Sequence, residues 1–385
     1  MAADRTHQMP NERSMLCIVP LSPPITGASL ISENIVNYLR RSSNILTIAY
    51  QRRKLGSGTF STSQVFRVLK CTLKLLYYRF FKKFETVYFV ISSSRWGNIR
   101  DLIFLAAMGR NLRRKLVIHL HGANFDTLMQ EASTQRRFFN RILYRNIKTA
   151  IVLGELFENI FDGYVSRNKV KVIKNYFDPS LLITESKVHV KFERLGQVNI
   201  LYLSNIMKEK GWSHLLNAFM LLPEEVRRKA NLHFAGTIHH RDRTEFLSKV
   251  GAVPYIFYHG IVSGSAKRDL LWQSHVFCLP TVYRFEGQPI SILEAYASGC
   301  YVLTTRNGGI KDIFVDGSNG HIIDNSLTID DSEFAVLLQH VISNIQKYKD
   351  IALNNRLEAM DKYSKNRYLQ AIKTTIVDAD NTAFP

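Results

Sequence analysis

Residues 276–304, VFCLPTVYRFEGQPISILEAYASGCYVLT, decide how this chain is organised. The stretch opens with the apolar run Val276–Leu279, passes through a polar loop, continues in a helical pattern after Pro289 and closes with the apolar run Tyr301–Thr304. Proline suits the first turn of a helix, because no amide donor is needed there. Two strands joined by a helix form a βαβ unit, so the stretch predicts parallel strands.

The same alternation of short β-rich runs and amphipathic stretches extends over the whole chain. The first series of predicted strands is Leu16–Leu21, Ile45–Tyr50, Thr86–Ile91, Leu116–Leu120, Thr149–Leu153 and Val170–Ile173. After a mixed polar stretch, the second series is Asn199–Leu203, Asn231–Ala235, Ile256–Tyr258, Val276–Leu279, Tyr301–Thr304 and Gly320–Ile323. We therefore predict an α/β protein with two doubly wound, Rossmann-like domains.

The predicted domains are residues 1–182 and 195–364, and residues 365–385 complete the first. One long helix is expected at Asp331–Tyr363, and a further helical pattern at Asn366–Val377 is expected to cross back to the first domain. In open α/β sheets, ligands bind beyond the carboxyl ends of the strands. Two facing domains would therefore form a central cleft, and the chemistry is expected in the strand-to-helix loops.

Composition places the chain among ordinary globular proteins, with 46% hydrophobic and 22% charged residues among 385. No apolar run approaches the roughly 18 residues of a membrane-spanning helix, so a polytopic membrane protein is excluded. The short apolar run Met15–Leu21 has no cleavage site after it, and we expect cytosolic retention. The four isolated cysteines predict reduced core residues rather than zinc ligands: Cys17, Cys71, Cys278 and Cys300.

The positive charge is concentrated in the first half of the chain. Lys and Arg exceed Asp and Glu by 17 through residue 182 and by only 2 afterwards. Such asymmetry indicates an anionic partner for one half. No nucleic-acid-binding motif accompanies the charge, so we expect no nucleic acid partner.

Gln64–Phe84 contains six basic residues and no acidic one. Its apolar stripe of Leu69, Leu73, Leu76 and Phe80 has helical spacing, which predicts a basic amphipathic helix. Such a helix either lies in an anionic membrane interface or packs its stripe on the core with a solvated basic side. Further basic clusters favour the interface: Arg52–Lys54, Arg110–Lys115 and Arg136–Arg145. The expected location is the cytoplasm, peripherally on the inner face of the membrane.

Four loops after predicted strands carry candidate ligand-binding residues. Gly27 precedes a helix, which suits either a tight turn or close approach of an anion. His121 ends a strand, and the alternation of side chains along a strand places it on the same side of the sheet as His119. Its role is either structural or catalytic. Lys210 leads a helix and is either a phosphate ligand or an exposed lysine. Glu286 and Glu294 are either routine first-turn acids or ligand-binding carboxylates.

The segment Arg284–Gly299, with its two glutamates separated by seven residues, resembles the motif of family 4 retaining glycosyltransferases of GT-B fold. The similarity continues to Gly320 through Gly308-Gly309 and is strongest over residues 199–325. A weaker match is Val172–Asp178, which resembles the family's interdomain element with Tyr176 in place of glycine. The resemblance implies that the first domain binds the acceptor and the second binds a nucleotide sugar.

Particular roles also follow from the resemblance. Glu286 is expected to contact the transferred sugar and Glu294 the nucleotide ribose, because a carboxylate can accept two hydrogen bonds from a diol. Lys210 resembles the diphosphate-binding lysine, but Asn205 stands where the family usually has an arginine; Lys208 or Arg284 are candidate replacements. His121 is expected near the reacting carbon. The remaining donor-binding residues implied are Gly27, Asn205, Gly287, Gln288, Pro289 and Ile290.

The implied activity is transfer of a hexose, with retention, from a UDP- or GDP-sugar to a lipid-linked or other membrane-near oligosaccharide acceptor in cell-surface polysaccharide biosynthesis. No cofactor and no metal is expected, since the only Asp-x-Asp triplet, Asp378–Asp380, lies in the C-terminal tail. Two alternatives remain open. One is a nucleotide-sugar epimerase of the same fold, and the other is a catalytically silent membrane scaffold that binds no donor.

Overall fold

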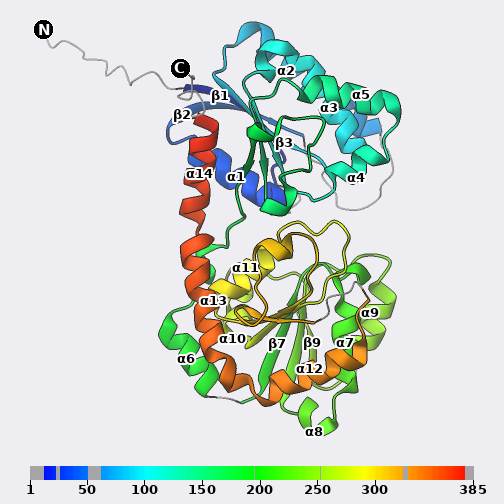
Figure 1. The fold of residues 1–385 in the computed structure, drawn as a ribbon, viewed down its shortest axis with the longest axis vertical. Coiled ribbons are helices and arrows are strands. Elements are labelled where there is room, and N and C mark those ends of the chain that lie inside the picture. Colours follow the sequence, from blue (N-terminus) through cyan, green and yellow to red (C-terminus); the bar gives the residue numbers. More distant parts are fainter. Residues whose placement is uncertain are drawn as a thin grey trace, which may run out of the picture. The chain divides into compact units, whose positions relative to one another are not determined.

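The computed structural model describes residues 13–22, 27–50, 62–194, 196–251, 253–323 and 328–377. The chain divides into two compact units (Figure 1). The first comprises Met1–Ile173 with Leu369–Pro385, and the second comprises Lys174–Tyr368. Each unit contains a parallel sheet of six strands, which confirms the predicted pair of doubly wound α/β domains.

The sheet of the first unit has the strand order β2-β1-β3-β4-β5-β6, and every pairing is parallel. Its strands overlap the six predicted runs, with ends that differ by up to three residues: β1 (Arg13–Val19), β2 (Ser43–Ala49), β3 (Thr86–Ile91), β4 (Leu116–Leu120), β5 (Thr149–Val152) and β6 (Val170–Val172). Residues Met15–Val19 and Thr86–Ile91 are buried throughout. Continuous apolar runs of this kind are expected where helices cover both faces of a parallel sheet.

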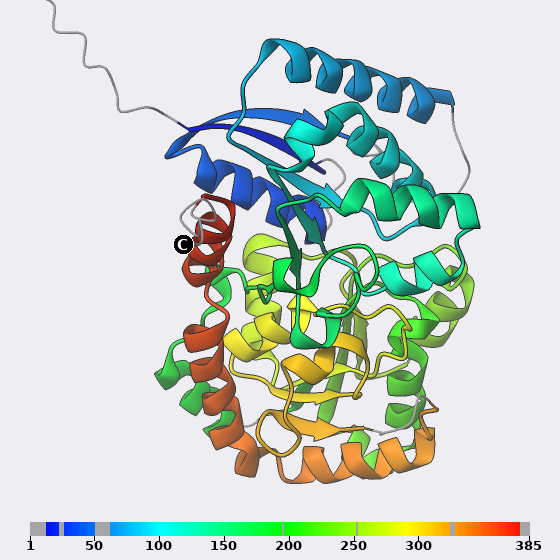
Figure 2. The ribbon, with the colours of Figure 1, turned by 45° about the horizontal axis from the view of Figure 1, so that its top comes forward.

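Helices cover both faces of this first sheet. Figures 1 and 2 show α1 (Gly27–Leu39) on one face, with α2 (Thr62–Phe81) and α3 (Arg95–Arg113) on the other. Next to α3 lies α5 (Thr134–Tyr144), after the short α4 (Phe125–Gln130). The layer α2-α3-α5 therefore forms one outer face of the first unit. Short 3-10 turns follow at Glu155–Phe157 and Arg167–Lys169.

The C-terminal helix α14 (Lys365–Val377) begins in the second unit and belongs to the first from Leu369 onward. The guanidinium of Arg13 donates to the Val377 carbonyl at 2.8 Å, and the Thr86 hydroxyl donates to the Ile376 carbonyl at 3.4 Å. These bonds, together with the buried Ile372 and Ile376, attach α14 to the first unit. The predicted crossing of the terminal helix is confirmed.

The sheet of the second unit has the strand order β12-β11-β10-β7-β8-β9, again with parallel pairings only. Its strands confirm the second predicted series: β7 (Val198–Leu203), β8 (Ala230–Ala235), β9 (Ile256–Tyr258), β10 (Val276–Leu279), β11 (Tyr301–Thr304) and β12 (Gly320–Ile322). The chain runs outward from β7 to β9 and then returns to the other side of β7 at β10. The strand order therefore reverses between β7 and β10, where ligands of such sheets bind.

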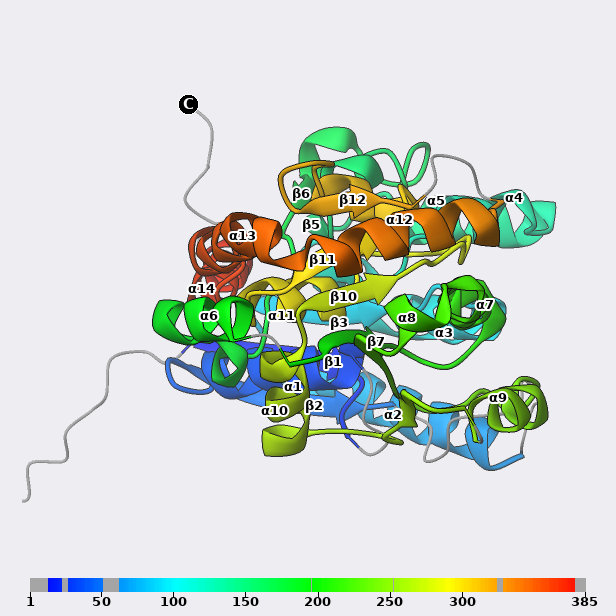
Figure 3. The same ribbon diagram turned by 90° about the horizontal axis from the view of Figure 1, so that it is seen from below.

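Helices also cover both faces of the second sheet, as Figure 3 shows. One face carries α7 (Trp212–Leu221) with α12 (Asp331–Ser343), and the other carries α11 (Ile290–Ala297) with α13 (Lys349–Lys362). The remaining helices are α6 (Glu185–Glu193), α8 (Glu224–Arg227), α9 (Arg243–Val250) and α10 (Gly264–Gln273). Short 3-10 segments are η3 (Pro179–Leu181), η4 (Lys208–Lys210), η5 (Gly308–Asp312) and η6 (Ile345–Tyr348).

Aromatic side chains anchor the core of the second unit beneath α7 and α9. Trp212, the first residue of α7, is fully buried and meets the ring of Phe246 edge-to-face, with centroids 5.1 Å apart. Phe234 on β8 contacts the same Phe246 ring at 5.5 Å. Such aromatic pairs contribute about 0.5–1.5 kcal/mol beyond the burial of their area. They fix the start of α7, and with it the loop that precedes this helix.

Two expectations about boundaries differ from the structure. The predicted long helix at Asp331–Tyr363 is wrong, because α12 ends at Ser343 and Asn344 leaves the helical conformation with φ −120°. The Asn344 side chain donates to the His340 carbonyl and so satisfies the end of the helix. Residues 174–182, predicted in the first domain, lie in the second unit. The reason is that Phe177 and Leu181 pack in the second core.

The helix predicted at Gln64–Phe84 is present as α2, but three of the four residues of its stripe do not face the core; the fourth, Leu76, packs partly buried against it. Leu69, Leu73 and Phe80 are 52%, 57% and 69% exposed. The buried residues of α2 are Cys71 and Leu75, which lie on a different line along the helix. The interpretation in which the stripe packs on the core is therefore wrong for Leu69, Leu73 and Phe80 and holds for Leu76. The cluster Arg52–Lys54 lies outside the described residues.

All four cysteines are free and buried, as predicted. Over the described parts of the chain, no helix is both long enough and apolar enough to cross a bilayer.

Candidate active site

The candidate site of the second unit lies where β7 and β10 end. The loop after β7 contains η4 and reaches α7 through Gly211, which has φ +81°. A Cβ atom on Gly211 would lie 1.8 Å from the Pro280 carbonyl oxygen, at the end of β10. Only glycine combines this left-handed conformation with so close an approach. The contact holds Lys210, the residue before Gly211, beside the loop that follows β10.

Lys210 and Glu286 form an ion pair at this point. The ammonium nitrogen of Lys210 lies 2.8 and 2.6 Å from the two carboxylate oxygens of Glu286. The Thr281 hydroxyl donates to the same carboxylate at 2.8 Å, and the Lys210 nitrogen lies 4.9 Å from the centre of the Tyr283 ring. The two charged side chains are only 15% and 5% exposed. The structure thus brings together two of the three predicted catalytic residues.

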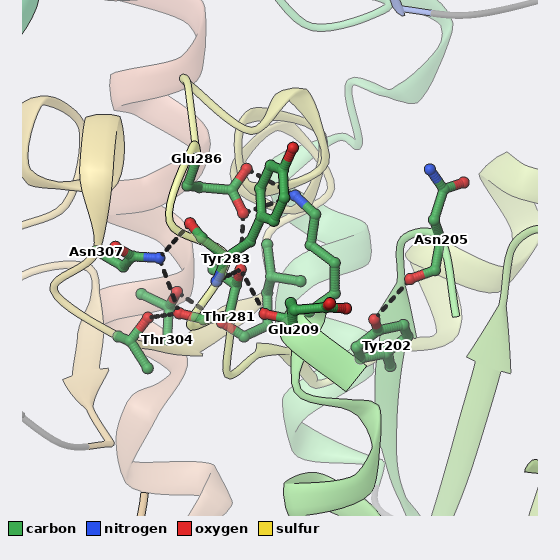
Figure 4. Close-up of polar contacts among 11 residues, drawn as sticks. Tyr202, Asn205, Glu209, Thr281, Tyr283, Glu286, Thr304 and Asn307 are labelled. Carbon is green, nitrogen blue, oxygen red and sulfur yellow. Dashed lines mark hydrogen bonds and ion pairs between the residues drawn. The ribbon is translucent and has the colours of Figure 1, made fainter. Parts of the chain in front are cut away.

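The backbone around Glu286 is fixed from the β11 side, as Figure 4 shows. The Asn307 amide group donates to the carbonyls of Thr281 and Tyr283, at 3.3 and 2.8 Å. The Gly309 amide donates to the Glu286 carbonyl at 3.1 Å. A Cβ atom on Gly308, whose φ is +50°, would lie 2.1 Å from that carbonyl oxygen. The Gly308-Gly309 turn therefore packs against Glu286 and fixes its position.

Glu294 lies on α11 and is buried, and its partner is Lys267 on α10. The Lys267 ammonium donates to a Glu294 carboxylate oxygen at 2.5 Å. Burial raises the pKa of Glu294, and the nearby Lys267 charge counteracts this shift. Lys267 was not found from the sequence. The sequence contains only a weak indication of this role. Lys267 is a cation in the first turn of a helix, where the helix dipole disfavours positive charge.

The residues between the two glutamates have well-defined surroundings. Gln288 is buried, its side-chain oxygen accepts from the Asn175 amide, and its carbonyl accepts from the Asn175 side chain at 3.1 Å. Within the described residues, Nε2 of Gln288 and Oδ1 of Asn175 are buried without a partner. Pro289 is the N-cap of α11 and Ile290 its first residue, so the loop from Gly287 leads directly into the helix N-terminus.

Asn205 follows β7 and is exposed. Its carbonyl accepts from the Tyr202 hydroxyl at 2.9 Å, and Figure 4 shows it apart from Glu286. Both candidate replacements for the missing arginine have partners other than Glu286. Lys208 pairs with Glu245 at 2.7 Å, and the Arg284 guanidinium lies over the Phe285 ring, 5.4 Å from its centre. Lys210 is therefore the charged group of this loop that contacts Glu286.

His121 and Gly27 belong to the first unit. The rings of His119 and His121 lie 4.0 Å apart, which confirms that they share one side of β4. Tyr88 bonds Nδ1 of His119 at 2.7 Å, while both ring nitrogens of His121 are buried without a partner among the residues described. Burial lowers the pKa of His121 to about 4, so its ring is neutral at pH 7. Gly27 is the exposed first residue of α1.

No group of three or more His, Cys, Asp or Glu side chains is placed to hold a metal ion in the part of the chain that is described. The triplet Asp378–Asp380 lies outside that part.

Solved structures share the architecture of this chain. One is HepE of Anabaena, in complex with UDP and glucose, with a TM-score of 0.70 and 17% identity over 95% of this chain and 100% of that chain. Another is WaaG, a glycosyltransferase involved in lipopolysaccharide biosynthesis, with a TM-score of 0.69 and 15% identity over 94% of this chain and 99% of that chain. The fold is therefore the GT-B fold, as expected from the sequence.

Residues 185–358 match the family described as glycosyl transferases group 1. Among curated relatives, an uncharacterised glycosyltransferase of Methanocaldococcus jannaschii is 20% identical over 64% of this chain and 66% of its own length. The 2-deoxystreptamine N-acetyl-D-glucosaminyltransferase of Niallia circulans is 27% identical over 45% of this chain and 43% of its own length. The chain thus spans just under two thirds of the first relative and less than half of the second. The match to glycosyl transferases group 1 therefore lies within the second unit and covers less than half of the chain.

Proposed function

We propose that this protein is a retaining, family 4 type glycosyltransferase that moves a hexose from a UDP- or GDP-sugar to a membrane-near glycan acceptor. The observation that carries the proposal is the buried Lys210–Glu286 pair at the switch point of the second sheet. Glu294 follows on the adjoining helix, held by Lys267. These groups supply a cation for a diphosphate and carboxylates for sugar and ribose hydroxyls.

Charge develops on the nucleotide diphosphate as the anomeric C–O bond breaks. Lys210 is the proposed partner of this charge, together with the amide groups at the N-terminus of α11, whose positive dipole end favours anions. The Glu286 carboxylate would then be released from Lys210 to accept from hydroxyls of the transferred sugar. We propose that the leaving phosphate takes the acceptor proton, on the face from which the nucleotide departs.

Glu294 is the proposed ribose ligand, accepting from both hydroxyls of the diol. Lys267 holds its carboxylate ionised and oriented, which makes Lys267 a positioning residue. His121 is the proposed hydrogen-bond donor to the donor sugar near the reacting carbon. Its neutral ring suits this task, because one ring nitrogen then carries a proton without a net positive charge. We propose that positive charge from Lys210 and α11 replaces a metal ion in this reaction.

The first unit is the proposed acceptor-binding unit, and its helical layer supports a membrane-near acceptor. The face of α2 exposes seven apolar side chains: Val65, Phe66, Leu69, Leu73, Tyr77, Phe80 and Phe81. Neither α2 nor α5 contains an acidic residue, while exposed lysines of α2 and the loop after it are Lys70, Lys74, Lys82 and Lys83. Buried apolar area and attraction to anionic lipid act together in interfacial helices. We propose peripheral binding to the inner face of the membrane.

The direct test is a panel of nucleotide sugars, with UDP-glucose first, because HepE has been solved with that ligand. Donor binding should raise the melting temperature, and incubation with a glycan acceptor should release nucleotide together with an elongated glycan. Glu286→Gln should lower the rate of transfer by about 100-fold or more, while Glu333→Gln, which changes an exposed carboxylate on α12, should leave the rate unchanged. Nucleotide released without acceptor would indicate an epimerase. Lack of stabilisation by every donor would indicate a scaffold.

A further inference from the structure

A pocket lies in the first unit, where α3 and α5 begin. Its volume is about 590 Å³. The apolar part of its lining comprises Ile99, Leu102, Ala132 and Phe139, and the polar part comprises Arg95, Glu131, Ser133, Gln135 and Arg136. None of these residues belongs to the candidate active site. An apolar wall beside two guanidinium groups matches an amphiphile that carries an anionic group.

The two arginines of this pocket are not neutralised by close partners. One guanidinium nitrogen of Arg136 donates to the Leu128 carbonyl at 3.2 Å, but its Nε is buried without a hydrogen-bond partner among the described residues. Arg95 lies over the ring of Trp96 and forms no ion pair within the described part of the chain. Burial, and then the charge of Arg95, lower the pKa of Arg136, while the charge of Glu131 opposes this shift.

The local helix geometry adds further positive potential. Arg95 is the first residue of α3, after the N-cap Ser94. Arg136 lies in the first turn of α5, where its amide donates to the N-cap Ser133. Cations are unfavourable at helix N-termini, because the dipole is positive there. Glu131 is the one acidic residue of the lining, so two cations and two positive helix ends face a single carboxylate. A bound anion would relieve this excess of positive charge.

The pocket lies next to two features that bear on function. The Asn124 side chain donates to the Ser93 carbonyl at 2.8 Å, and a Cβ atom on Gly122 would meet the Ser93 hydroxyl oxygen at 2.5 Å. The segment that leads to Arg95 therefore packs on the segment that follows His121. The helices that form the pocket also expose apolar side chains on the layer α2-α3-α5: Trp96, Ile103, Phe138 and Ile142.

We propose that this pocket binds the phosphate of a membrane-borne lipid, with Arg95 and Arg136 on the phosphate oxygens and the apolar wall against the adjoining carbons. The proposal rests on the proposed transfer to a membrane-near acceptor and names the group by which such a lipid is held. Guanidinium groups bind phosphate oxygens in pairs of parallel hydrogen bonds. A phosphomonoester is preferred over a phosphodiester, because its second negative charge matches the second arginine.

The test is sedimentation of the full chain with phosphatidylcholine vesicles that contain phosphatidic acid, phosphatidylglycerol or a polyprenyl monophosphate, matched for total negative charge. Arg95→Gln with Arg136→Gln should lower binding to the phosphomonoester vesicles by about tenfold or more, since charged hydrogen bonds are involved. The matched control is Arg137→Gln with Arg141→Gln, two exposed arginines on α5 outside the pocket lining. The control should weaken binding to all three vesicles alike and keep the monoester preference.

Equal losses in the two double variants, or no monoester preference in the native chain, would overturn the proposal in favour of general surface charge. A preference for polyprenyl phosphate over phosphatidic acid would assign the pocket to a lipid-linked acceptor, and equal binding would assign it to membrane phospholipid. Circular dichroism and melting temperature check the folding of both variants. Sedimentation does not depend on glycosyl transfer, so failure of the proposed reaction would leave this result intact.

Discussion

Lys210 and Glu286 lie 76 positions apart in the chain, yet both carboxylate oxygens of Glu286 accept from the Lys210 ammonium, at 2.8 and 2.6 Å. The pair joins the loops that follow β7 and β10 and is largely buried. A buried ion pair is costly to break by removing one partner, because the other charge then lacks compensation. The same two side chains are those proposed to meet the diphosphate and the sugar.

The Lys210–Glu286 pair predicts that substitutions can restore the stability of the protein without restoring its activity. Lys210→Ala should lower the free energy of unfolding by about 3–5 kcal/mol, since Glu286 is left buried and unpaired. Adding Glu286→Gln should restore part of that stability, because no uncompensated charge remains. Both variants should lose about 100- to 1,000-fold in kcat, as expected for loss of transition-state charge stabilisation. Urea denaturation and steady-state kinetics provide the measurements; equal stability of the single and double variants would contradict the prediction.

Lys267 should control the charge of Glu294. Burial raises the pKa of Glu294 and Lys267 opposes that shift, so Lys267→Met should raise the pKa further. Less of the ionised carboxylate is then present at mildly acidic pH, and the acid limb of the donor-binding profile should move to higher pH. Titration calorimetry with UDP-glucose between pH 5 and pH 8 measures this. Lys249→Met, an exposed lysine of α9, is the control and should leave the profile unchanged.

Gly211 should tolerate no side chain, for reasons beyond its backbone conformation. Gly317 has nearly the same φ, +78° against +81°, but a Cβ atom added there would meet no neighbouring side chain or backbone within 4 Å. Gly317→Ala should therefore cost only the conformational penalty, about 1–2 kcal/mol. Gly211→Ala should cost more and lower activity as well, because the Pro280 carbonyl must move and Lys210 with it. Similar unfolding midpoints for the two variants would refute this.

His121 should make stability depend on pH. Its pKa is about 4 in the folded chain, below the ordinary value of 6.5, so the unfolded chain binds more protons between these values. The contribution of His121 to the free energy of unfolding should therefore be greatest above pH 6.5 and should fall as the pH approaches 4, by about 2 kcal/mol between pH 7 and pH 5. His121→Gln should reduce this loss. The control His340→Gln, on the exposed end of α12, should retain it in urea titrations at both pH values.

The exposed face of α2 predicts salt-sensitive membrane binding. Vesicles rich in anionic lipid should sediment the protein at low salt, and replacing the four lysines by glutamine should weaken binding by about 1 kcal/mol each: Lys70, Lys74, Lys82 and Lys83. Replacing Leu69, Leu73 and Phe80 by serine should weaken it at any salt concentration, because buried apolar area is lost.

Four exposed lysines of the second unit provide the matched control for this experiment: Lys229, Lys249, Lys347 and Lys362. Their replacement removes the same charge from surfaces without such an apolar face and should leave sedimentation nearly unchanged. If both sets of variants reduced binding equally, net charge rather than α2 would account for it.

The twelve strands and most of the helices were predictable because their information is local. A buried parallel strand is a short apolar run, and an amphipathic helix has apolar residues that recur about every 3.6 positions. Both patterns can be recognised without knowing which element packs against them. The break at Asn344 was missed because helical periodicity continues on both sides of it. The orientation of α2 could not be predicted for a related reason. Leu69 and Leu73 form a stripe as regular as that of Cys71 and Leu75, and periodicity does not show which of the two stripes packs on the sheet.

The sequence by itself determined the α/β class and the two parallel sheets, and it singled out Glu286 and Glu294 as candidate ligand-binding residues. Each of these predictions depends on residue order over a few tens of positions. Only the tertiary structure decided that Lys210 pairs with Glu286, that Lys267 holds Glu294, and that Arg95 and Arg136 share a pocket. Those contacts join side chains from loops and helices that are far apart in the sequence. Their distances follow from how strands are ordered in the sheet and from close packing at residues such as Gly211, which no local pattern encodes.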